Sequence, residues 1–319
     1  MGGDRGGSAE PKKNGRKEEK KLSTGIGLLL KGLGGFFAII FEPEDTSIKA
    51  SDHQARLSPC EESKMRARIA AIVFLLGAAV AQTGSAEKEW LGSTGQRVRA
   101  AIFRGAQARA HPVLVVVLHG DLDAAYHYVL AANAAKQIQG IVAAALVRPG
   151  YADDAGDTSD GKKGDATGDN YTPKVLNQLD AAIHQLIAEL HPSAVVLMGH
   201  SGGAAISADL LAWDKGLAKA ALLLSCPCDV PAWRKHMKTL HPFPQWDDPV
   251  TSVSPMDVVD KINPKARISL IVGEKDTTAP PEFTQEYASA LRKHGIEPKV
   301  TVLPGRDHNL VVFDSEVMK

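Results

Sequence analysis

The residue whose setting suggests chemistry most directly is Ser201, which lies in the segment Gly199-His200-Ser201-Gly202-Gly203. A short apolar run over residues 194–198 precedes this segment, and apolar residues at helical spacing follow it over residues 205–211. A serine at a sharp turn from strand to helix exposes its hydroxyl above the sheet, and the flanking glycines let the backbone approach closely. The alternative, a structural turn of small residues, does not account for the strand and the helix on either side. We therefore predict that Ser201 is a nucleophile.

A serine hydroxyl becomes a useful nucleophile only when an imidazole takes its proton, and a carboxylate must fix the tautomer of that imidazole. Both groups follow strand-like runs near the end of the chain: Asp276 follows residues 268–272, and His308 follows residues 299–303. Because reactive side chains collect at the carboxyl ends of parallel strands, we expect both to meet Ser201. The prediction is a triad in which Ser201 attacks, His308 acts as general base and then acid, and Asp276 orients His308.

The attack of a serine on a carbonyl group creates a negative charge on oxygen, and preorganised donors must stabilise that charge. One donor would be the backbone N–H of Gly202, which follows the nucleophile at the start of a helix. The other would come from the loop that follows the strand-like run of residues 113–118, at Asp121 or Leu122. We therefore predict an oxyanion hole made by Gly202 and this loop.

Strand-like and helix-like segments alternate through most of the remaining chain. The strand-like segments are residues 97–104, as an early edge strand, and residues 113–118, 141–147, 194–198, 218–225, 268–272 and 299–303. Helical patterns cover residues 124–139, 174–190 and 281–294, besides the one after Ser201. Strands separated by helices of this length predict βαβ units with right-handed crossovers, and so an α/β fold with a mostly parallel central sheet and helices on both faces.

Five segments in this order resemble the α/β-hydrolase superfamily. They are Leu118-His119-Gly120, Arg148-Pro149-Gly150-Tyr151, Gly199-His200-Ser201-Gly202-Gly203, Gly273-Glu274-Lys275-Asp276 and Gly305-Arg306-Asp307-His308. The pattern is most similar to single-domain serine hydrolases related to prolyl oligopeptidase catalytic domains and to dienelactone hydrolases. The resemblance implies the same triad and oxyanion hole. Two features depart from it: dienelactone hydrolases have cysteine where Ser201 stands, and no β-propeller precedes the catalytic part.

The acid position has one serious competitor. Glu274 comes too early in its turn, and Asp307 is adjacent to His308 and so points elsewhere. Asp229 follows the strand-like run of residues 218–225, and some hydrolases of the resembling fold have their acid there. The choice between Asp276 and Asp229 therefore stays open at this point, with Asp276 favoured.

The first part of the chain has the composition of a leader rather than of a folded domain. Residues 1–64 are expected to be disordered or to precede the true start of translation. Residues 65–86 combine arginines, an apolar stretch and small residues, as a signal peptide does. We expect export to the periplasm or the exterior and a mature domain of residues 87–319. An uncleaved anchor is the alternative, and the protein would be cytoplasmic if residues 1–64 are genuine and block export.

The composition indicates which kinds of partner and cofactor the protein is expected to bind. The 37 basic and 37 acidic residues balance, which gives no reason to expect nucleic acid or a stable membrane association. No cofactor is expected, and no Cys or His spacing matches a zinc site. The aspartates of residues 152–170 do not match a calcium loop, so we expect a solvated, mobile rim loop there. Cys226 and Cys228 are expected to be two free, partly buried thiols, because a proline between them stiffens a strained bridge. A disulfide is the alternative, since both would meet oxidants in an exported protein.

Residues 229–265 interrupt the alternation and predict a small lid-like insertion. Trp233 in this insertion is a candidate for the substrate pocket, with covering of the sheet edge as an equal alternative. Tyr151 and Tyr171 bracket the aspartate-rich loop and are expected at the pocket entrance. His119, which precedes the oxyanion loop, is a further candidate for the substrate pocket.

These features predict a serine hydrolase that cleaves a carboxylic ester, thioester or amide through an acyl-enzyme. A peptidase of the prolyl oligopeptidase type and an acyltransferase are alternatives with the same triad. A hydrolase-fold binding module without activity is the alternative of another class. The substrate is expected to be a small-molecule or peptide acyl compound.

Overall fold

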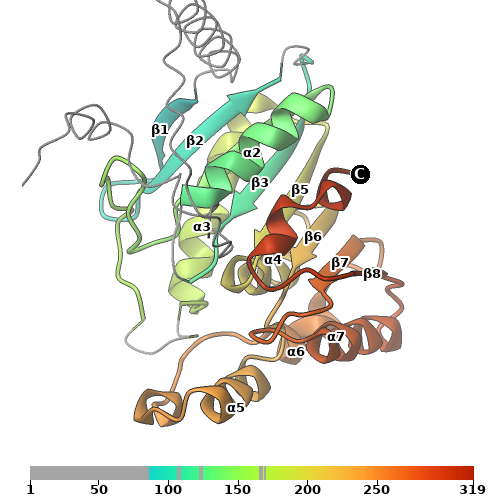
Figure 1. Ribbon diagram of the computed structural model, residues 1–319. Coiled ribbons are helices and arrows are strands. Elements are labelled where there is room, and N and C mark those ends of the chain that lie inside the picture. Colours follow the sequence, from blue (N-terminus) through green and yellow to red (C-terminus); the bar gives the residue numbers. More distant parts are fainter. Residues whose placement is uncertain (1–85, 106–108, 122–124, 165–167, 169) are drawn as a thin grey trace, which may run out of the picture. The chain divides into compact units, whose positions relative to one another are not determined.

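The computed structural model describes residues 86–105, 109–121, 125–164, 168 and 170–319 (Figure 1). Their core is one eight-stranded sheet with the strand order β1-β2-β4-β3-β5-β6-β7-β8. β1 pairs antiparallel with β2 and β2 antiparallel with β4, whereas every pairing from β4 to β8 is parallel. The strands are β1 Glu87–Leu91, β2 Val98–Arg104, β3 Val113–Leu118, β4 Ile141–Leu146, β5 Ala194–His200, β6 Ala220–Leu224, β7 Arg267–Gly273 and β8 Lys299–Leu303.

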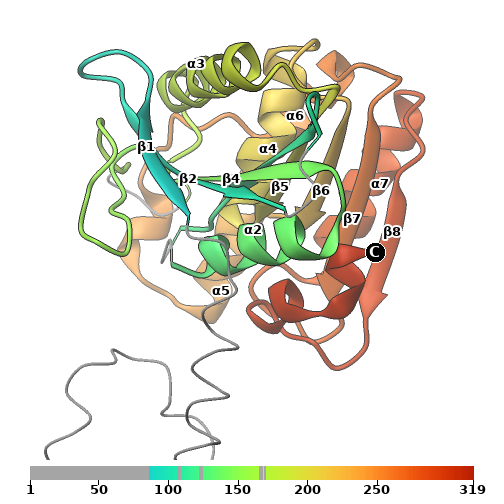
Figure 2. The ribbon, with the colours of Figure 1, turned by 90° about the horizontal axis from the view of Figure 1, so that it is seen from above.

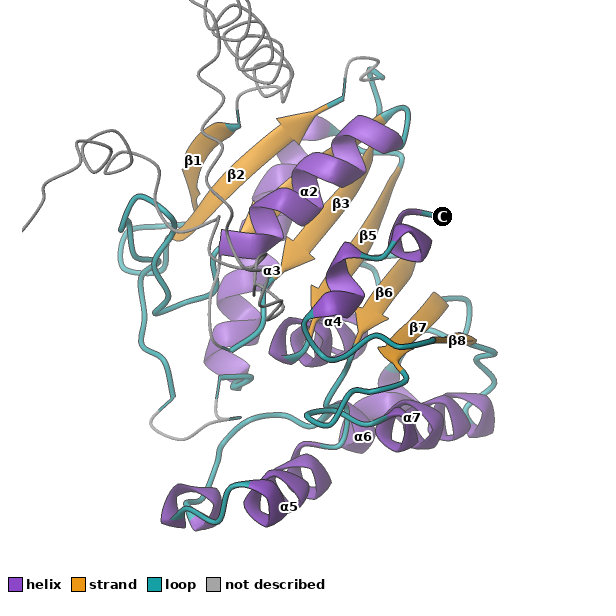
Figure 3. Cartoon of the chain, viewed as in Figure 1, coloured by secondary structure: helices purple, strands orange, loops and turns teal. Residues whose placement is uncertain are grey.

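The sheet lies between two layers of helices (Figures 2 and 3). α2 (Ala125–Gln137) covers one face together with the C-terminal turns η3 (Leu310–Phe313) and η4 (Ser315–Met318). α3 (Pro173–Leu190), α4 (Gly202–Trp213) and α7 (Pro281–Lys293) cover the other face. Successive residues of β3 contribute to the two cores in turn, because side chains alternate between the faces of a strand. This arrangement confirms the predicted α/β-hydrolase architecture, with a mostly parallel sheet and helices on both faces.

One strand was not expected from the sequence. β1 reads Glu-Lys-Glu-Trp-Leu, in which charged residues hide the pattern of a strand. It pairs with β2 through all five of its residues and forms the edge of the sheet. The prediction that residues 97–104 form the edge strand is therefore wrong: β2 is the second strand, with four of its seven residues buried.

The segment between β6 and β7 contains the helices α5 (Val230–Leu240) and α6 (Pro255–Val258) and the turns η1 (Pro244–Asp247) and η2 (Val259–Lys261). The buried guanidinium of Arg234 joins two parts of it, because its Nη2 donates to the carbonyl oxygens of Gln245, Trp246 and Asp248 at 2.9–3.1 Å. That this insertion acts as a lid stays a prediction. In the part of the chain that the structure describes, no helix has both the length and the apolar character needed to cross a membrane.

Cys226 and Cys228 form a disulfide, with their Cα atoms 5.1 Å apart. The expectation of two free, partly buried thiols is therefore wrong in both respects, since the two residues are 2% and 0% exposed. The physical reason is that Pro227 does not hold the two cysteines apart, since a Cα separation of 5.1 Å lies within the usual range for a disulfide.

The N-terminal predictions lie outside the described residues. They concern the segment 1–64 and the signal peptide of residues 65–86, of which only Ala86 is described. The start of the mature domain at residue 87 also stays a prediction.

A buried carboxyl group lies in α4. Asp209 is 1% exposed, and neither of its side-chain oxygens has a hydrogen-bond partner among the described residues. Burial disfavours the charged form, so the pKa of Asp209 lies well above its ordinary value. Asp209 therefore keeps its proton in the folded protein at pH values where the unfolded chain has lost it.

We expect Asp209→Asn to stabilise the protein increasingly as pH rises. The unfolded carboxyl group ionises near pH 3.8 and the folded one does not, so the wild-type protein loses about 1.4 kcal/mol of unfolding free energy per pH unit above that value, up to the folded pKa. The asparagine variant lacks this loss. Urea unfolding of both proteins at pH 4, 6 and 8 measures the difference. A difference that stays constant with pH, as expected for the exposed control Asp260→Asn, would contradict the buried neutral acid.

Candidate active site

Ser201 lies at the turn from β5 to α4 with φ of 53° and ψ of −123°. This backbone conformation is costly for a residue with a side chain, and such strain is typical of a serine at a nucleophile turn. The turn is held to the neighbouring strand because the N–H of Ser201 donates to the carbonyl oxygen of Leu224 at 2.9 Å. Ser201 thus stands at the carboxyl end of β5, as the sequence predicts, and the structure shows that it is half-buried.

The glycines around Ser201 allow backbone segments to touch. A Cβ on Gly199 would lie 2.1 Å from the carbonyl oxygen of Gly203, on the other side of the turn. A Cβ on Gly203 would lie 2.2 Å from the carbonyl oxygen of Leu118, at the end of β3. Both are backbone atoms that cannot swing away, so the close packing of α4 on the sheet requires glycine at these two positions.

We expect Gly203→Ala to destabilise the protein by about 1–3 kcal/mol or more, because the added methyl group meets backbone rather than a flexible side chain. Thermal unfolding measures this loss. Gly216→Ala is the matched control, because its Cβ would approach only the side-chain oxygen of Asp214, at 3.2 Å. Equal melting temperatures for Gly203→Ala and wild type would show that α4 can move away from β3 at little cost.

The structure brings the three predicted triad residues together. His308 Nε2 lies 2.9 Å from Ser201 Oγ, and His308 Nδ1 lies 2.9 Å and 3.0 Å from the two carboxylate oxygens of Asp276. These residues come from the ends of three strands and are separated by as many as 107 positions in the sequence. The arrangement has the geometry in which an imidazole can take a proton from the serine while a carboxylate holds its other nitrogen.

The carboxylate of Asp276 is held firmly. Its side chain is fully buried, and Oδ1 also accepts the backbone N–H groups of Thr278 at 3.0 Å and Ala279 at 2.8 Å. The loops of the acid and the base touch at Gly273, where a Cβ would lie 2.3 Å from the carbonyl oxygen of Arg306. Asp276 therefore has a fixed position from which it can orient His308.

The other candidate acids have structural partners. Asp229 is the N-cap of α5, and its Oδ1 accepts the N–H of Ala232 at 3.0 Å. Glu274 accepts the N–H of Gly305 at 2.8 Å, and Asp307 accepts the N–H groups of Asn309 and Leu310. None of these contacts involves the ring of His308, so the geometry selects Asp276 from the competitors.

The loop after β3 lies against the serine turn, as expected of an oxyanion loop. A Cβ on Gly202 would lie 2.4 Å from Oδ1 of Asp121, so the two residues predicted to supply donors are adjacent. The Asp121 carboxylate is fixed on both oxygens, by Arg148 Nη1 at 2.8 Å and by the hydroxyl of Tyr171 at 2.7 Å. Leu122, the alternative donor, lies outside the described residues, and the donor roles of Gly202 and Asp121 stay predictions.

Three of the predicted pocket residues lie behind this loop rather than at an entrance. His119 and Tyr171 are fully buried, and Tyr151 is 3% exposed. The Tyr151 hydroxyl donates to the carbonyl oxygen of Asp121 at 3.1 Å, and Tyr171 holds the carboxylate of the same residue. The entrance expected of the two tyrosines is thus corrected to support of the loop, because their hydroxyl groups have partners inside the protein. Trp233 is 4% exposed and donates to the carbonyl oxygen of Thr278 at 2.9 Å.

His119 is fixed in one tautomer. Burial holds its pKa well below the ordinary value, so the ring is neutral. Its Nε2 accepts the N–H of Arg148 at 3.0 Å, which leaves the proton on Nδ1, and Nδ1 donates to the carbonyl oxygen of Gly120 at 2.7 Å. The ring therefore ties the ends of β3 and β4 together at the start of the oxyanion loop.

The aspartate-rich segment is better ordered than the sequence suggests. Asp153 has a fully buried side chain, which accepts the N–H groups of Ala155 and Asp157 and pairs with Lys88 and Arg99. The interpretation as a solvated rim loop is therefore wrong for this residue. The cause is the unexpected strand β1, which supplies Lys88 as a partner for it.

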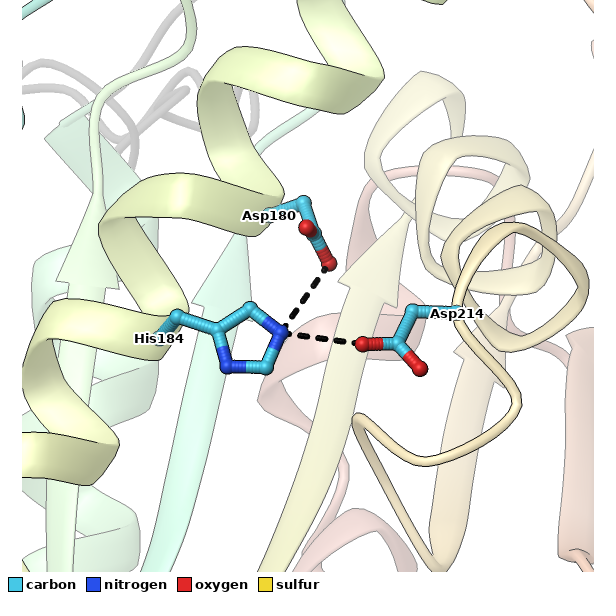
Figure 4. A group of neighbouring side chains, drawn as sticks. All are labelled: Asp180, His184 and Asp214. Carbon is cyan, nitrogen blue, oxygen red and sulfur yellow. Dashed lines mark hydrogen bonds and ion pairs between the residues drawn. The ribbon is translucent and has the colours of Figure 1, made fainter.

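One group of potential metal ligands occurs in the described part of the chain, away from the triad. Asp180 and His184 from α3 and Asp214 at the end of α4 place their ligand atoms within 4.8 Å of one another (Figure 4). His184 Nε2 is bonded to Asp214 at 2.9 Å, and Oδ1 of Asp214 accepts the N–H of Gly216. These bonds account for the arrangement as a surface link between two helices.

Comparison with known proteins agrees with this geometry. Residues 161–317 match the model of the prolyl oligopeptidase family, a span that includes all three triad residues. The structure is similar to an acylaminoacyl peptidase from Pyrococcus horikoshii, with a TM-score of 0.58 and 13% identity. The chain has the fold of the α/β-hydrolase superfamily. The family match supports a serine hydrolase of the prolyl oligopeptidase type, whereas no curated protein matches the sequence.

The similar structures differ in the share of their own length that this chain covers. The match includes 76% of this chain but only 41% of the Pyrococcus peptidase, and 70% of this chain but 36% of a Mycobacterium tuberculosis puromycin-hydrolysing peptidase, with 16% identity and a TM-score of 0.55. Est1E from Butyrivibrio proteoclasticus, solved with ferulic acid, is covered over 96% of its length, with 72% of this chain, 18% identity and a TM-score of 0.58.

Sequence reasoning missed several residues of the site. Arg148 is 1% exposed between Tyr151 and Tyr171 and holds Asp121, but its position after β4 in an Arg-Pro-Gly segment was the only signal. Tyr126 at the start of α2 bonds to the loop at Gly120, and nothing in the helical pattern distinguishes it. Residues that support a site are recognised by their contacts, which a single sequence does not give.

Proposed function

We propose that this α/β-hydrolase cleaves a carboxylic ester through an acyl-enzyme on Ser201. The observation that carries the proposal is the 2.9 Å contact of His308 Nε2 with Ser201 Oγ, with Asp276 on the opposite nitrogen of the ring. In the proposed reaction His308 takes the serine proton as the oxygen attacks the carbonyl carbon. The resulting oxyanion is stabilised by the N–H groups of Gly202 and the Asp121 loop.

His308 then gives the proton to the leaving alcohol as the tetrahedral intermediate collapses to the acyl-enzyme. A water molecule attacks the acyl group next, with His308 again as base, and releases the acid and the free serine. Each step needs only this chain's own residues and water, and we propose no metal or organic cofactor for it.

Two observations favour an ester of an apolar group over a peptide. Leu310 and Phe313, two and five residues after the base, are 47% and 58% exposed and offer apolar surface on η3, the turn that follows His308. The structural similarity covers almost all of Est1E, a protein solved with a bound carboxylic acid, but well under half of each peptidase. A peptidase of the prolyl oligopeptidase type is the second candidate, because residues 161–317 match that family.

Hydrolysis of a series of p-nitrophenyl esters of increasing acyl length, beside aminoacyl p-nitroanilides, tests this proposal. We expect turnover of the esters with a burst of p-nitrophenol, equal to one molecule per enzyme, when deacylation is slower than acylation. Faster turnover of the anilides would replace the ester by a peptide substrate. Turnover of neither series by folded protein would leave the inactive binding module.

We also propose that the domain is exported. The predicted signal peptide of residues 65–86 and the disulfide between Cys226 and Cys228 both suit an oxidising compartment. N-terminal sequencing of the protein recovered from a secreting host is the test. A first residue near 87 is expected, and a start near residue 1 would contradict export through this signal.

A further inference from the structure

The residue just before the nucleophile has two hydrogen bonds that the proposed reaction does not use. The ring of His200 lies between the base and α2: its Nε2 is 2.8 Å from the backbone carbonyl oxygen of His308, and its Nδ1 is 2.9 Å from the hydroxyl of Tyr126. That hydroxyl lies 2.5 Å from the backbone nitrogen of Gly120, in the oxyanion loop. A continuous chain of contacts therefore joins the loop of the base to the loop of the oxyanion hole.

The donor and the acceptor of each hydrogen bond in this series follow from the groups at its two ends. A carbonyl oxygen can only accept, so Nε2 of His200 must hold a proton and donate it to His308. Burial lowers the pKa of His200 to about 3, so the ring is neutral and Nδ1 is an acceptor. The Tyr126 hydroxyl therefore donates to Nδ1, and its oxygen is left to accept the N–H of Gly120. No other assignment satisfies all three contacts.

The residues packed around these hydrogen bonds include Ser201 and His308, so the bonds lie within the candidate active site. A Cβ on Gly120 would lie 3.1 Å from both the Tyr126 hydroxyl and Cβ of Ser201. The His200 ring is 4.9 Å from the ring of His308 and meets the Tyr126 ring edge to face at 5.4 Å. His200 is 4% exposed, so water does not compete for its bonds. Buried bonds in series also polarise one another, which makes such a chain more rigid than its separate bonds.

We infer that His200 and Tyr126 are positioning residues, which fix the loop of His308 and the loop of Gly120 relative to each other. The kinetic effects that we expect from this inference rest on the proposed hydrolysis, whereas the hydrogen bonds that support it do not. Because Gly120 gives its N–H to Tyr126, that group is not an oxyanion donor, and in the proposed reaction the donor from this loop, beside Gly202, would be Asp121. We call His200 and Tyr126, with their bonds to His308 and Gly120, the relay. It holds Gly120, the residue before Asp121, against the turn of Ser201.

Three substitutions separate the two halves of the relay. His200→Gln keeps a donor near the Nε2 position for the His308 carbonyl but removes the acceptor for Tyr126. His200→Asn keeps an acceptor near the Nδ1 position but removes the donor to His308. Tyr126→Phe removes the bonds of the hydroxyl to Gly120 and to His200 and keeps the ring. Tyr128→Phe is the matched control, because it lies on the same helix and its hydroxyl has no hydrogen-bond partner among the described residues.

The readouts are kcat and KM for a p-nitrophenyl ester, the rate of fluorophosphonate labelling and the melting temperature. We expect Tyr126→Phe and His200→Gln each to lower kcat and the labelling rate about tenfold with KM changed less than threefold. The double variant should fall well short of the hundredfold loss of two independent effects, because both changes break the same link. His200→Asn should in addition shift the acid limb of the kcat/KM profile, since it releases the loop of the base.

A merely structural role would lower the melting temperature and leave the kcat of the folded fraction at the wild-type value. Wild-type kcat and labelling rates in the folded variants, or fully multiplicative losses in the double variant, would overturn the relay.

Histidine ¹⁵N NMR tests the same inference without any activity. We expect the neutral Nε2–H tautomer of His200 to persist from pH 8 to pH 5 in the wild type, with the Nδ1 shift changed by Tyr126→Phe but not by Tyr128→Phe. If wild-type protein neither turns over nor labels, the proposed function fails while this spectrum still decides the relay. A protonated ring at pH 5 or the Nδ1–H tautomer would overturn it.

Discussion

Replacing Ser201 by alanine is expected to lower kcat for ester hydrolysis by roughly 10⁶-fold and to leave substrate binding almost unchanged. The substitution removes the hydroxyl that would form the proposed acyl-enzyme, whereas the oxyanion loop and the apolar surface stay in place. His308→Ala should cost about as much, because a serine without a base is not activated. Steady-state kinetics with a p-nitrophenyl ester, together with the inhibition constant of a product acid, separate the loss of chemistry from a loss of binding.

The two changes should not add. Once either partner is absent the triad no longer works as a unit, so the double variant Ser201→Ala/His308→Ala should be no slower than the single variants. The distance of 2.9 Å between the two reacting atoms is the reason for this expectation. A double variant that is slower than both single variants by a further factor of a thousand would mean that the residues act in separate steps.

Replacing Asp276 by asparagine is expected to lower kcat by about 10⁴-fold while the fold persists. Asparagine has the same shape, and its oxygen can still accept from Thr278 and Ala279 as Asp276 does. It has no negative charge to stabilise the imidazolium, however, and its amide group favours the wrong tautomer of His308. The measurement is kcat at the pH optimum, with the melting temperature as the test of folding.

Asp229→Asn is the control that the chain itself offers. Asp229 is the alternative acid that the sequence leaves open, and the structure uses it to cap α5. Asparagine caps helices about as well as aspartate, so kcat and stability should stay within about twofold and 0.5 kcal/mol of wild type. If Asp229→Asn were the damaging change and Asp276→Asn the mild one, the acid would have been assigned to the wrong strand.

The sequence predicts the triad because its members have local signatures. Ser201 lies in a glycine motif between a strand and a helix, and Asp276 and His308 each follow an apolar run that proves to be a strand. A parallel sheet then brings such strand ends to one edge without further information. β3 and β8 have the predicted bounds of residues 113–118 and 299–303, because each strand is also marked by its own local run of residues.

What the sequence does not predict depends on contacts between distant residues. The relay joins His200 to Tyr126 and His308 across 74 and 108 positions, and no spacing rule relates them. The disulfide joins Cys226 and Cys228 across a proline, and no motif in the sequence predicts that their Cα atoms lie only 5.1 Å apart. β1 was missed because its residues alternate charge rather than hydrophobicity.

The most direct test of the central claim is covalent labelling by a fluorophosphonate probe, with the modified residue identified by mass spectrometry of the digested protein. The account predicts one phosphonate group per molecule, attached to Ser201, and no labelling of the folded Ser201→Ala variant. Labelling of another residue, or folded wild-type protein that does not react with the probe, would contradict the assignment of Ser201 as the nucleophile of this hydrolase.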